Sequence, residues 1–90
     1  MTITYSPAHL DYGLDTFFGR ITKSIECEVG LEAVVDDPYC FALRVPAPVP
    51  DDLHQATIVV VKVDGRTLQG SVRHIERLDD ESLKLEVEPD

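Results

Sequence analysis

The side chains of this sequence that are able to perform catalysis lie apart from one another. Its three histidines, His9, His54 and His74, follow no metal-binding spacing such as HxxH or HExxH. With only two cysteines the chain also lacks the ligand set of a structural zinc site. No serine has a nucleophile-elbow context, and no glycine-rich loop is present to hold a phosphate.

The remaining candidates for acid–base chemistry are three pairs of adjacent aspartates: Asp36-Asp37, Asp51-Asp52 and Asp79-Asp80. Each pair falls in a predicted turn, where carboxylates cap backbone amides and stay hydrated. General acid–base catalysis instead needs carboxylates whose pKa values are shifted by burial. We therefore expect no enzymatic activity, no cofactor and no metal site.

Length and composition limit the class of protein. Ninety residues with 43% apolar and 28% charged side chains fit one small domain with a single core. No apolar run is long enough for a transmembrane helix, and the N-terminus lacks the basic start and apolar stretch of a signal peptide. We expect a single domain, 1–90, that is cytoplasmic and not associated with a membrane.

Acidic residues outnumber basic ones by 17 to 8, which gives a formal charge of −9. A field of this sign repels phosphates, so direct nucleic-acid binding is disfavoured, and residues 46–90 contain no Phe, Tyr or Trp on which bases could stack. The same charge favours association with a partner protein that has a basic surface. Acids are concentrated in two segments, 26–37 and 76–90.

The N-terminal segment has features of a short helix. Ser6 suits an N-cap and Pro7 suits the first helical position. Apolar residues at helical spacing follow, namely Leu10, Leu14, Phe17 and Phe18. We therefore expect a short helix within residues 1–22 that packs on the end of the domain; the alternative use of its two phenylalanines is to dock a partner.

From Ile25 onward apolar and polar residues alternate, which is typical of half-buried strands. The predicted strands cover residues 25–35, 39–45, 56–63, 66–78 and 83–87. Asp64-Gly65 is a two-residue hairpin turn signal, and a change of phase predicts a bulge or bend between Gly70 and His74. The expected fold is mainly β: a small, partly closed antiparallel β-barrel of about five to six strands over residues 23–90.

The first predicted strand has one wet, negative face. Three glutamates share it, and the following turn adds two aspartates and a tyrosine. Together they form the predicted partner-binding surface: Glu26, Glu28, Glu32, Asp36, Asp37 and Tyr39. Cys27 and Cys40 fall in flanking apolar stretches as free thiols, although strand pairing across the turn could bring them within reach of a redox-sensitive bridge.

Two resemblances to known families follow from these segments. "VKVDGRTLQG" resembles the first signature of Sm-like RNA-binding proteins, but their second signature has no counterpart before Asp90. The stretch from Ser24 to Val87 resembles the PilZ domain, the small barrel of cyclic di-GMP receptors. "LRVPAPVPDD" is similar to the connection after that family's nucleotide-binding turn, and "GSVRHIERLDDESLKLEV" is similar to its final hairpin.

The departures from the PilZ pattern concern the nucleotide grip. That family uses an RxxxR arm and a D/NxSxxG turn. Here "RITKS" has Arg20 but Ser24 in place of the second arginine, and "DDPYCFA" lacks the serine and the glycine. The resemblance therefore implies a degenerate PilZ-like domain that does not bind cyclic di-GMP and acts by contacting other proteins.

These observations predict a non-enzymatic protein–protein interaction or regulatory module, similar to a PilZ-like adaptor. The alternative is a small acidic inhibitor, of phage or mobile-element type, that blocks a nucleic-acid-binding partner by charge mimicry. A steep dependence of partner affinity on salt would indicate the inhibitor. A third hypothesis is a true ligand-binding barrel, which calorimetric titration with cyclic di-GMP and with a short RNA would test. No residue pattern selects an oligomeric state.

Overall fold

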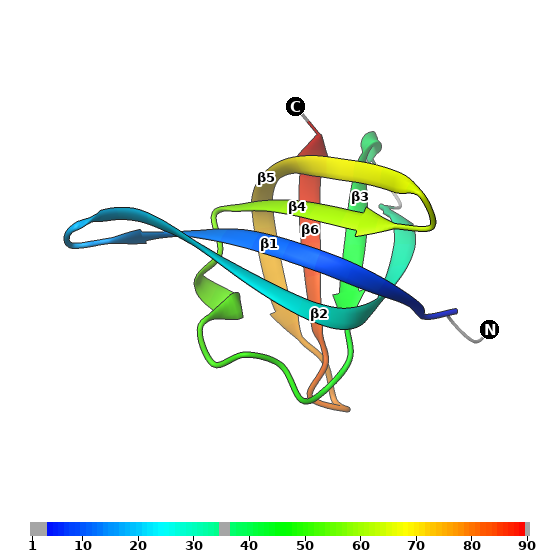
Figure 1. Ribbon diagram of the computed structural model, residues 1–90. Coiled ribbons are helices and arrows are strands. Elements are labelled where there is room, and N and C mark those ends of the chain that lie inside the picture. Colours follow the sequence, from blue (N-terminus) through cyan, green and yellow to red (C-terminus); the bar gives the residue numbers. More distant parts are fainter. Residues whose placement is uncertain (1–3, 35–36, 90) are drawn as a thin grey trace.

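Six antiparallel strands close on themselves into a β-barrel (Figure 1). The computed structural model describes residues 4–34 and 37–89, with the backbone alone for Asp37 and Pro38. The strands are β1 (Ser6–Thr16), β2 (Gly19–Val34), β3 (Asp37–Val45), β4 (Ile58–Val63), β5 (Arg66–Arg77) and β6 (Leu83–Pro89). Their order around the barrel is β1-β2-β3-β6-β5-β4, and β4 pairs back onto β1. The expected small antiparallel barrel is confirmed, in a closed form.

The interior of the barrel is filled by alternate residues of every strand. Its fully buried members include Leu10 and Tyr12 from β1, Leu43 from β3, Val61 from β4 and Leu85 from β6. Because successive side chains of a strand point to opposite faces, the period-two pattern of the sequence becomes one buried and one wet face. One turn of 3-10 helix, η1 (Leu53–Gln55), interrupts the connection between β3 and β4. Among the described residues, no helix has the length and apolar character needed to cross a membrane.

The expected N-terminal helix is wrong, because residues 6–16 form β1 and β2 begins at Gly19. Leu10 and Leu14 stand four residues apart, as on a helix, but Ala8, Leu10, Tyr12 and Leu14 also alternate as on a strand, and all four are buried. Pairing with β2 on one side and with β4 on the other provides hydrogen-bond partners for the backbone amide and carbonyl groups of β1. The phenylalanines expected to pack on the domain instead occupy the turn that joins β1 to β2.

The C-terminal hairpins follow the sequence pattern. Asp64 and Gly65 have φ values of 52° and 76°, the left-handed conformation that a type I′ hairpin turn requires at both positions. The pairing of β5 with β6 shifts register between Val72 and His74, so the predicted bulge is confirmed. The bulge returns Ile75 to a position opposite Leu85, where it packs against the core.

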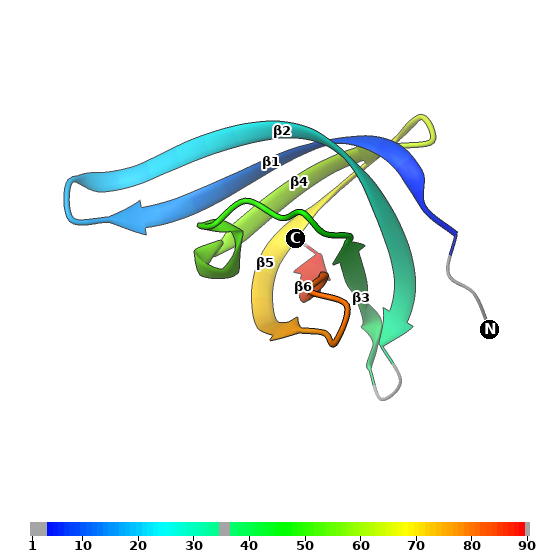
Figure 2. The same cartoon turned by 90° about the horizontal axis from the view of Figure 1, so that it is seen from below.

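The β1–β2 hairpin is longer than the barrel. β1 pairs with β2 along its whole length, but it pairs with β4 only from Ala8 to Gly13. The rest of the hairpin projects from the barrel (Figures 1 and 2) and lies along the longest dimension of a molecule that measures 42 × 27 × 27 Å. We call this projection, residues 14–21, the arm.

Gly70 is required by close contact between β5 and β6. A Cβ atom at this position would lie 2.2 Å from the carbonyl oxygen of Glu88, a backbone atom that cannot move independently. We expect Gly70→Ala to lower the free energy of unfolding by about 2 kcal/mol, since overpacking forces backbone shifts. Urea denaturation measures the change, with Ser71→Ala on the exposed side of β5 as the control. An unchanged unfolding midpoint for Gly70→Ala would contradict this account.

Candidate functional site

The most unusual surface feature is an aromatic pair at the end of the arm. Phe17 and Phe18 are 98% and 96% exposed, although large apolar side chains normally contribute to the core. Their rings contact each other edge to face, with centroids 5.5 Å apart and an interplanar angle of 82°. Ile21, 43% exposed, adds a third apolar side chain on the arm. We call Phe17 and Phe18 the aromatic tip.

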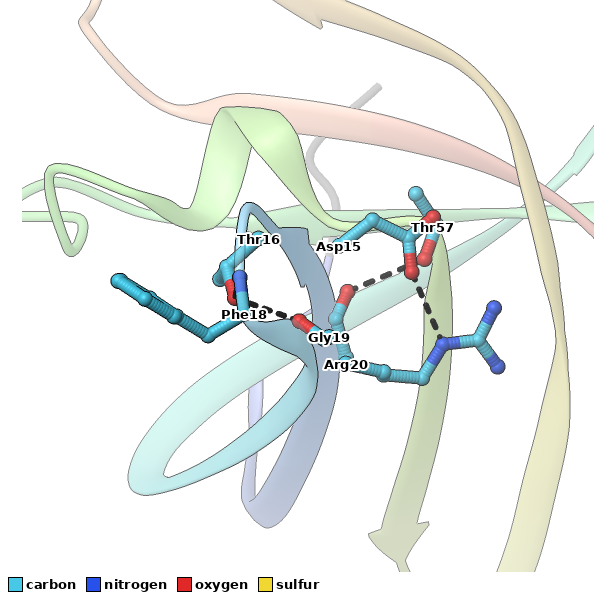
Figure 3. A network of polar contacts seen from close by, with 7 residues as sticks. Asp15, Thr16, Phe18, Gly19, Arg20 and Thr57 are labelled. Carbon is cyan, nitrogen blue, oxygen red and sulfur yellow. Dashed lines mark hydrogen bonds and ion pairs between the residues drawn. The ribbon is translucent and has the colours of Figure 1, made fainter.

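Hydrogen bonds within the turn hold the tip in place. The Thr16 hydroxyl donates to the Gly19 carbonyl at 2.5 Å and accepts from the Phe18 amide at 3.2 Å. Gly19 has a φ of 114°, a conformation that favours glycine. Across the hairpin, Arg20 Nε donates to Asp15 at 3.0 Å. Figure 3 shows these bonds and the Phe18 side chain pointing away from them.

The base of the arm is attached to the barrel where β4 begins. The Thr57 amide donates to the Gly13 carbonyl at 2.9 Å, and the Thr57 hydroxyl reaches the same oxygen at 3.3 Å (Figure 3). Gly13 allows this approach, because a Cβ atom there would lie only 2.7 Å from Cγ1 of Ile58. The arm therefore leaves the barrel from an anchored point.

A second attachment lies on the inner face of the hairpin. The buried Tyr12 donates its hydroxyl to Asp52 at 2.8 Å, and Lys23 forms an ion pair with the other oxygen of the same carboxylate. Burial, with the neighbouring Asp52 carboxylate, raises the pKa of Tyr12 to about 12. The bonds from Lys23 and Tyr12 lower the pKa of Asp52 below its ordinary 3.8. Asp52 thus joins both strands of the hairpin to the segment before η1.

The outer face of the hairpin carries a histidine between two carboxylates. His9 contacts Glu26 through Nδ1 at 2.8 Å and Asp11 through Nε2 at 3.1 Å. The hydrogen bond with Glu26 is the main cause that raises the pKa of His9 above 6.5. Ser24 donates its hydroxyl to Asp11, which lowers the pKa of that carboxyl. Because Ser24 contacts Asp11 and not the imidazole, the cluster lacks the nucleophile–base contact that covalent catalysis uses.

The structure separates the residues of the sequence-predicted surface. Glu26 and Glu28 are exposed on the part of β2 that pairs with β1. β2 bends where its pairing changes from β1 to β3 (Figures 1 and 2). Glu32 lies beyond this bend, partly buried, at 3.6 Å from Arg44 and 3.8 Å from Lys84. The remaining predicted members come later in the sequence.

Those remaining members are two aspartates and a tyrosine. Tyr39 is 82% exposed on β3. Asp37 begins β3 by its backbone, and Asp36 lies outside the described residues. Glu26 and Glu28 therefore lie on the part of the β1–β2 hairpin that leads to the arm, whereas Glu32 forms ion pairs with two basic side chains, Arg44 and Lys84.

The other side chains that could perform chemistry lie apart from one another. Cys27 and Cys40 are not joined in a disulfide and are both partly buried, and burial raises the pKa of the Cys27 thiol. In the part of the chain that the structure describes, no three His, Cys, Asp or Glu side chains are grouped to hold a metal ion. An open surface hollow of about 480 Å³ has mixed charge, with lining residues Arg44, Glu76, Arg77, Leu78, Asp79 and Asp80.

The sequence analysis expected Phe17 and Phe18 to pack on the end of the domain and gave partner docking as the alternative. Helical spacing placed both phenylalanines on a buried face, and the acidic pattern drew attention to β2 instead. A usable signal was present: Thr16 to Gly19 reads as a short turn between two alternating segments.

Comparison of the chain with models of known protein families, with characterised proteins and with solved structures finds no match. Its own residues therefore carry the functional proposal.

We expect Tyr12→Phe to lower the free energy of unfolding by about 1 kcal/mol at neutral pH, because a buried hydrogen bond to a carboxylate is lost. Since the pKa of Asp52 is depressed in the folded protein, the stabilisation is present above the ordinary carboxyl pKa and disappears as pH falls through the lowered value. Denaturation at neutral and acidic pH measures this, with Tyr5→Phe as a control outside the cluster. If Tyr12→Phe lowers the free energy of unfolding equally at both pH values, the stabilisation does not come from the bond to the Asp52 carboxylate.

We expect His9 to titrate above 6.5 in an NMR titration of its ring protons. Glu26→Gln should lower that pKa most and Asp11→Asn less, while Glu28→Gln, one position further along the same face, should leave it unchanged. A raised histidine pKa stabilises the fold below the unfolded pKa, and this contribution is lost as pH rises through the folded value. A pKa of His9 at or below 6.5 would show that the carboxylates do not engage the ring.

Proposed function

We propose that this protein is a non-enzymatic protein-interaction module whose main contact is the aromatic tip. The exposure of Phe17 and Phe18 on an anchored hairpin is the single observation that carries the proposal. Burial of one such side chain contributes roughly 1.5–3 kcal/mol. An apolar pocket on a partner that accepts both rings therefore contributes about 3–6 kcal/mol to binding, and contacts around the tip supply the rest.

Preorganisation supports the use of the arm as a docking element. The bonds of Thr16 and the Asp15–Arg20 pair hold the turn, and Thr57 and Asp52 hold the base. A contact element that is ordered before binding loses less conformational entropy when it docks. The arm thus presents its apolar end in a defined direction.

The negative charge of this protein favours a partner protein whose contact surface is basic. The formal charge of −9, with the exposed carboxylates of Glu26 and Glu28 near the arm, attracts cationic surfaces and opposes approach to an anionic membrane. The PilZ-like resemblance stays a prediction. Arg20 is the one arginine at the position of the PilZ RxxxR motif, and it donates a hydrogen bond to Asp15. This pairing within the chain supports an adaptor that does not bind cyclic di-GMP.

We expect Phe17→Ser/Phe18→Ser to abolish partner capture from a lysate of the native host, measured by quantitative mass spectrometry against the unmodified protein. The unfolding midpoint should stay the same within error, because both side chains are already in water. Tyr39→Ser, which removes an exposed aromatic side chain on the other hairpin, is the matched control. If the double variant still captures the partner and Tyr39→Ser does not, the partner contacts Tyr39 on β3 and not the aromatic tip.

A further inference from the structure

A hollow lies at the end of the barrel opposite the arm. The β4–β5 turn is at this end, whereas the arm projects from the other (Figures 1 and 2). The hollow measures about 390 Å³, and its lining comes from β2 and β3 on one side and from the start of β5 on the other. Small-molecule sites begin at about 300 Å³ and commonly occupy the mouths of β-barrels. We call this hollow, between β2, β3 and β5, the mouth hollow.

Apolar side chains from three strands line the mouth hollow. They are Leu31 and Ala33 from β2, Phe41 from β3 and Leu68 from β5. Leu31, Phe41 and Leu68 pack against the core, but each is only partly buried. The apolar surface that these side chains leave in water favours contact with the apolar part of a ligand.

Arg66 places a positive charge at the edge of this apolar lining. It stands directly opposite Val63 across the β4–β5 hairpin, and opposed residues of an antiparallel pair share a face. Because Val63 is buried, Arg66 occupies an inward-facing position at the end of the barrel. In the part of the chain that the structure describes, Arg66 forms no ion pair. A guanidinium without a carboxylate of its own is suited to bind an anion.

The neighbouring charges favour an anion that carries a single charge. Asp64, in the turn before Arg66, lines an adjacent hollow. Glu32 also lines the mouth hollow, but Arg44 and Lys84 engage its carboxylate. With these two carboxylates nearby and a formal charge of −9, a phosphate dianion is repelled more strongly than a carboxylate. A carboxylate also matches the planar fork of the guanidinium.

We propose that the mouth hollow binds a medium-chain fatty acid, with its carboxylate on Arg66 and its acyl chain against Leu31, Phe41 and Leu68. The volume of the hollow equals that of roughly thirteen water molecules at about 30 Å³ each, which accommodates octanoate. This site goes beyond the interaction function proposed for the aromatic tip, and the two lie at opposite ends of the molecule (Figure 1). It is tested on the purified protein without any partner, so its failure leaves the tip proposal unaffected.

The first experiment titrates the isotope-labelled protein with octanoate and follows the amide signals by NMR. We expect saturable shifts at Leu31, Phe41 and Leu68, and none at Phe17 on the arm. Hexanoate should bind about tenfold more weakly, because each of the two missing methylene groups contributes up to about a factor of four when buried. Absence of saturable shifts with millimolar octanoate, shifts centred on the arm, or equal affinity for the two acids overturns the proposal.

The second experiment tests the contact between Arg66 and the carboxylate. We expect Arg66→Gln to weaken octanoate binding about tenfold, since a charge-assisted hydrogen bond is lost, and to leave the binding of uncharged octanol unchanged. Arg77→Gln, which removes an exposed arginine at the other end of β5, is the matched control and should alter neither affinity. Equal weakening of octanoate and octanol by Arg66→Gln overturns the assignment of the carboxylate to this arginine.

The third experiment separates a free fatty acid from the carboxyl terminus of another protein. A hexapeptide that ends in leucine offers the same carboxylate beside an apolar side chain. We expect it to bind at least tenfold more weakly than octanoate, because its polar backbone loses hydration against the apolar lining. Tighter binding of the peptide than of octanoate overturns the assignment to a fatty acid.

Discussion

The unequal pairing of β1 is the constraint from which the other surface features follow. Its full length, Ser6–Thr16, is paired with β2, whereas β4 covers only Ala8–Gly13. Beyond Gly13 the hairpin has no barrel wall beside it and little core beneath it. A two-stranded hairpin of this kind is marginal unless other groups hold it. The arm and the aromatic tip are both consequences of this excess length.

Polar contacts take the place of core packing in the arm. At its base, one carboxylate, Asp52, receives bonds from both strands, through Tyr12 and Lys23. At its end, Thr16 satisfies backbone groups on both sides of the turn. A chain of this size has little apolar surface to spare for stability. Two phenylalanines left in water therefore indicate a use outside the fold, and docking to a partner protein is the use we propose.

Residues of the same type and strand face differ in role because other strands set their surroundings. Glu26 and Glu28 are exposed on β2, as the alternating pattern predicts, whereas Glu32 is partly buried. Glu26 meets His9 from β1, whereas Glu32 lies beyond the bend and meets Arg44 from β3 and Lys84 from β6. The face was predictable from sequence, but the partners were not, since they come from segments distant along the chain. The acidic surface is consequently divided at the bend.

The sequence by itself determined the features that depend on neighbouring residues. These are the mainly β class, the Asp64-Gly65 turn and the bulge that restores the phase of β5. It could not choose the structure of residues 6–16, where Leu10 and Leu14 fit a helix as well as a strand. The tertiary structure made that choice, because a strand's hydrogen bonds are satisfied by β2 and β4, which no local pattern specifies. For the same reason only the assembled barrel shows that β4 ends its cover at Gly13, which leaves Phe17 and Phe18 in water.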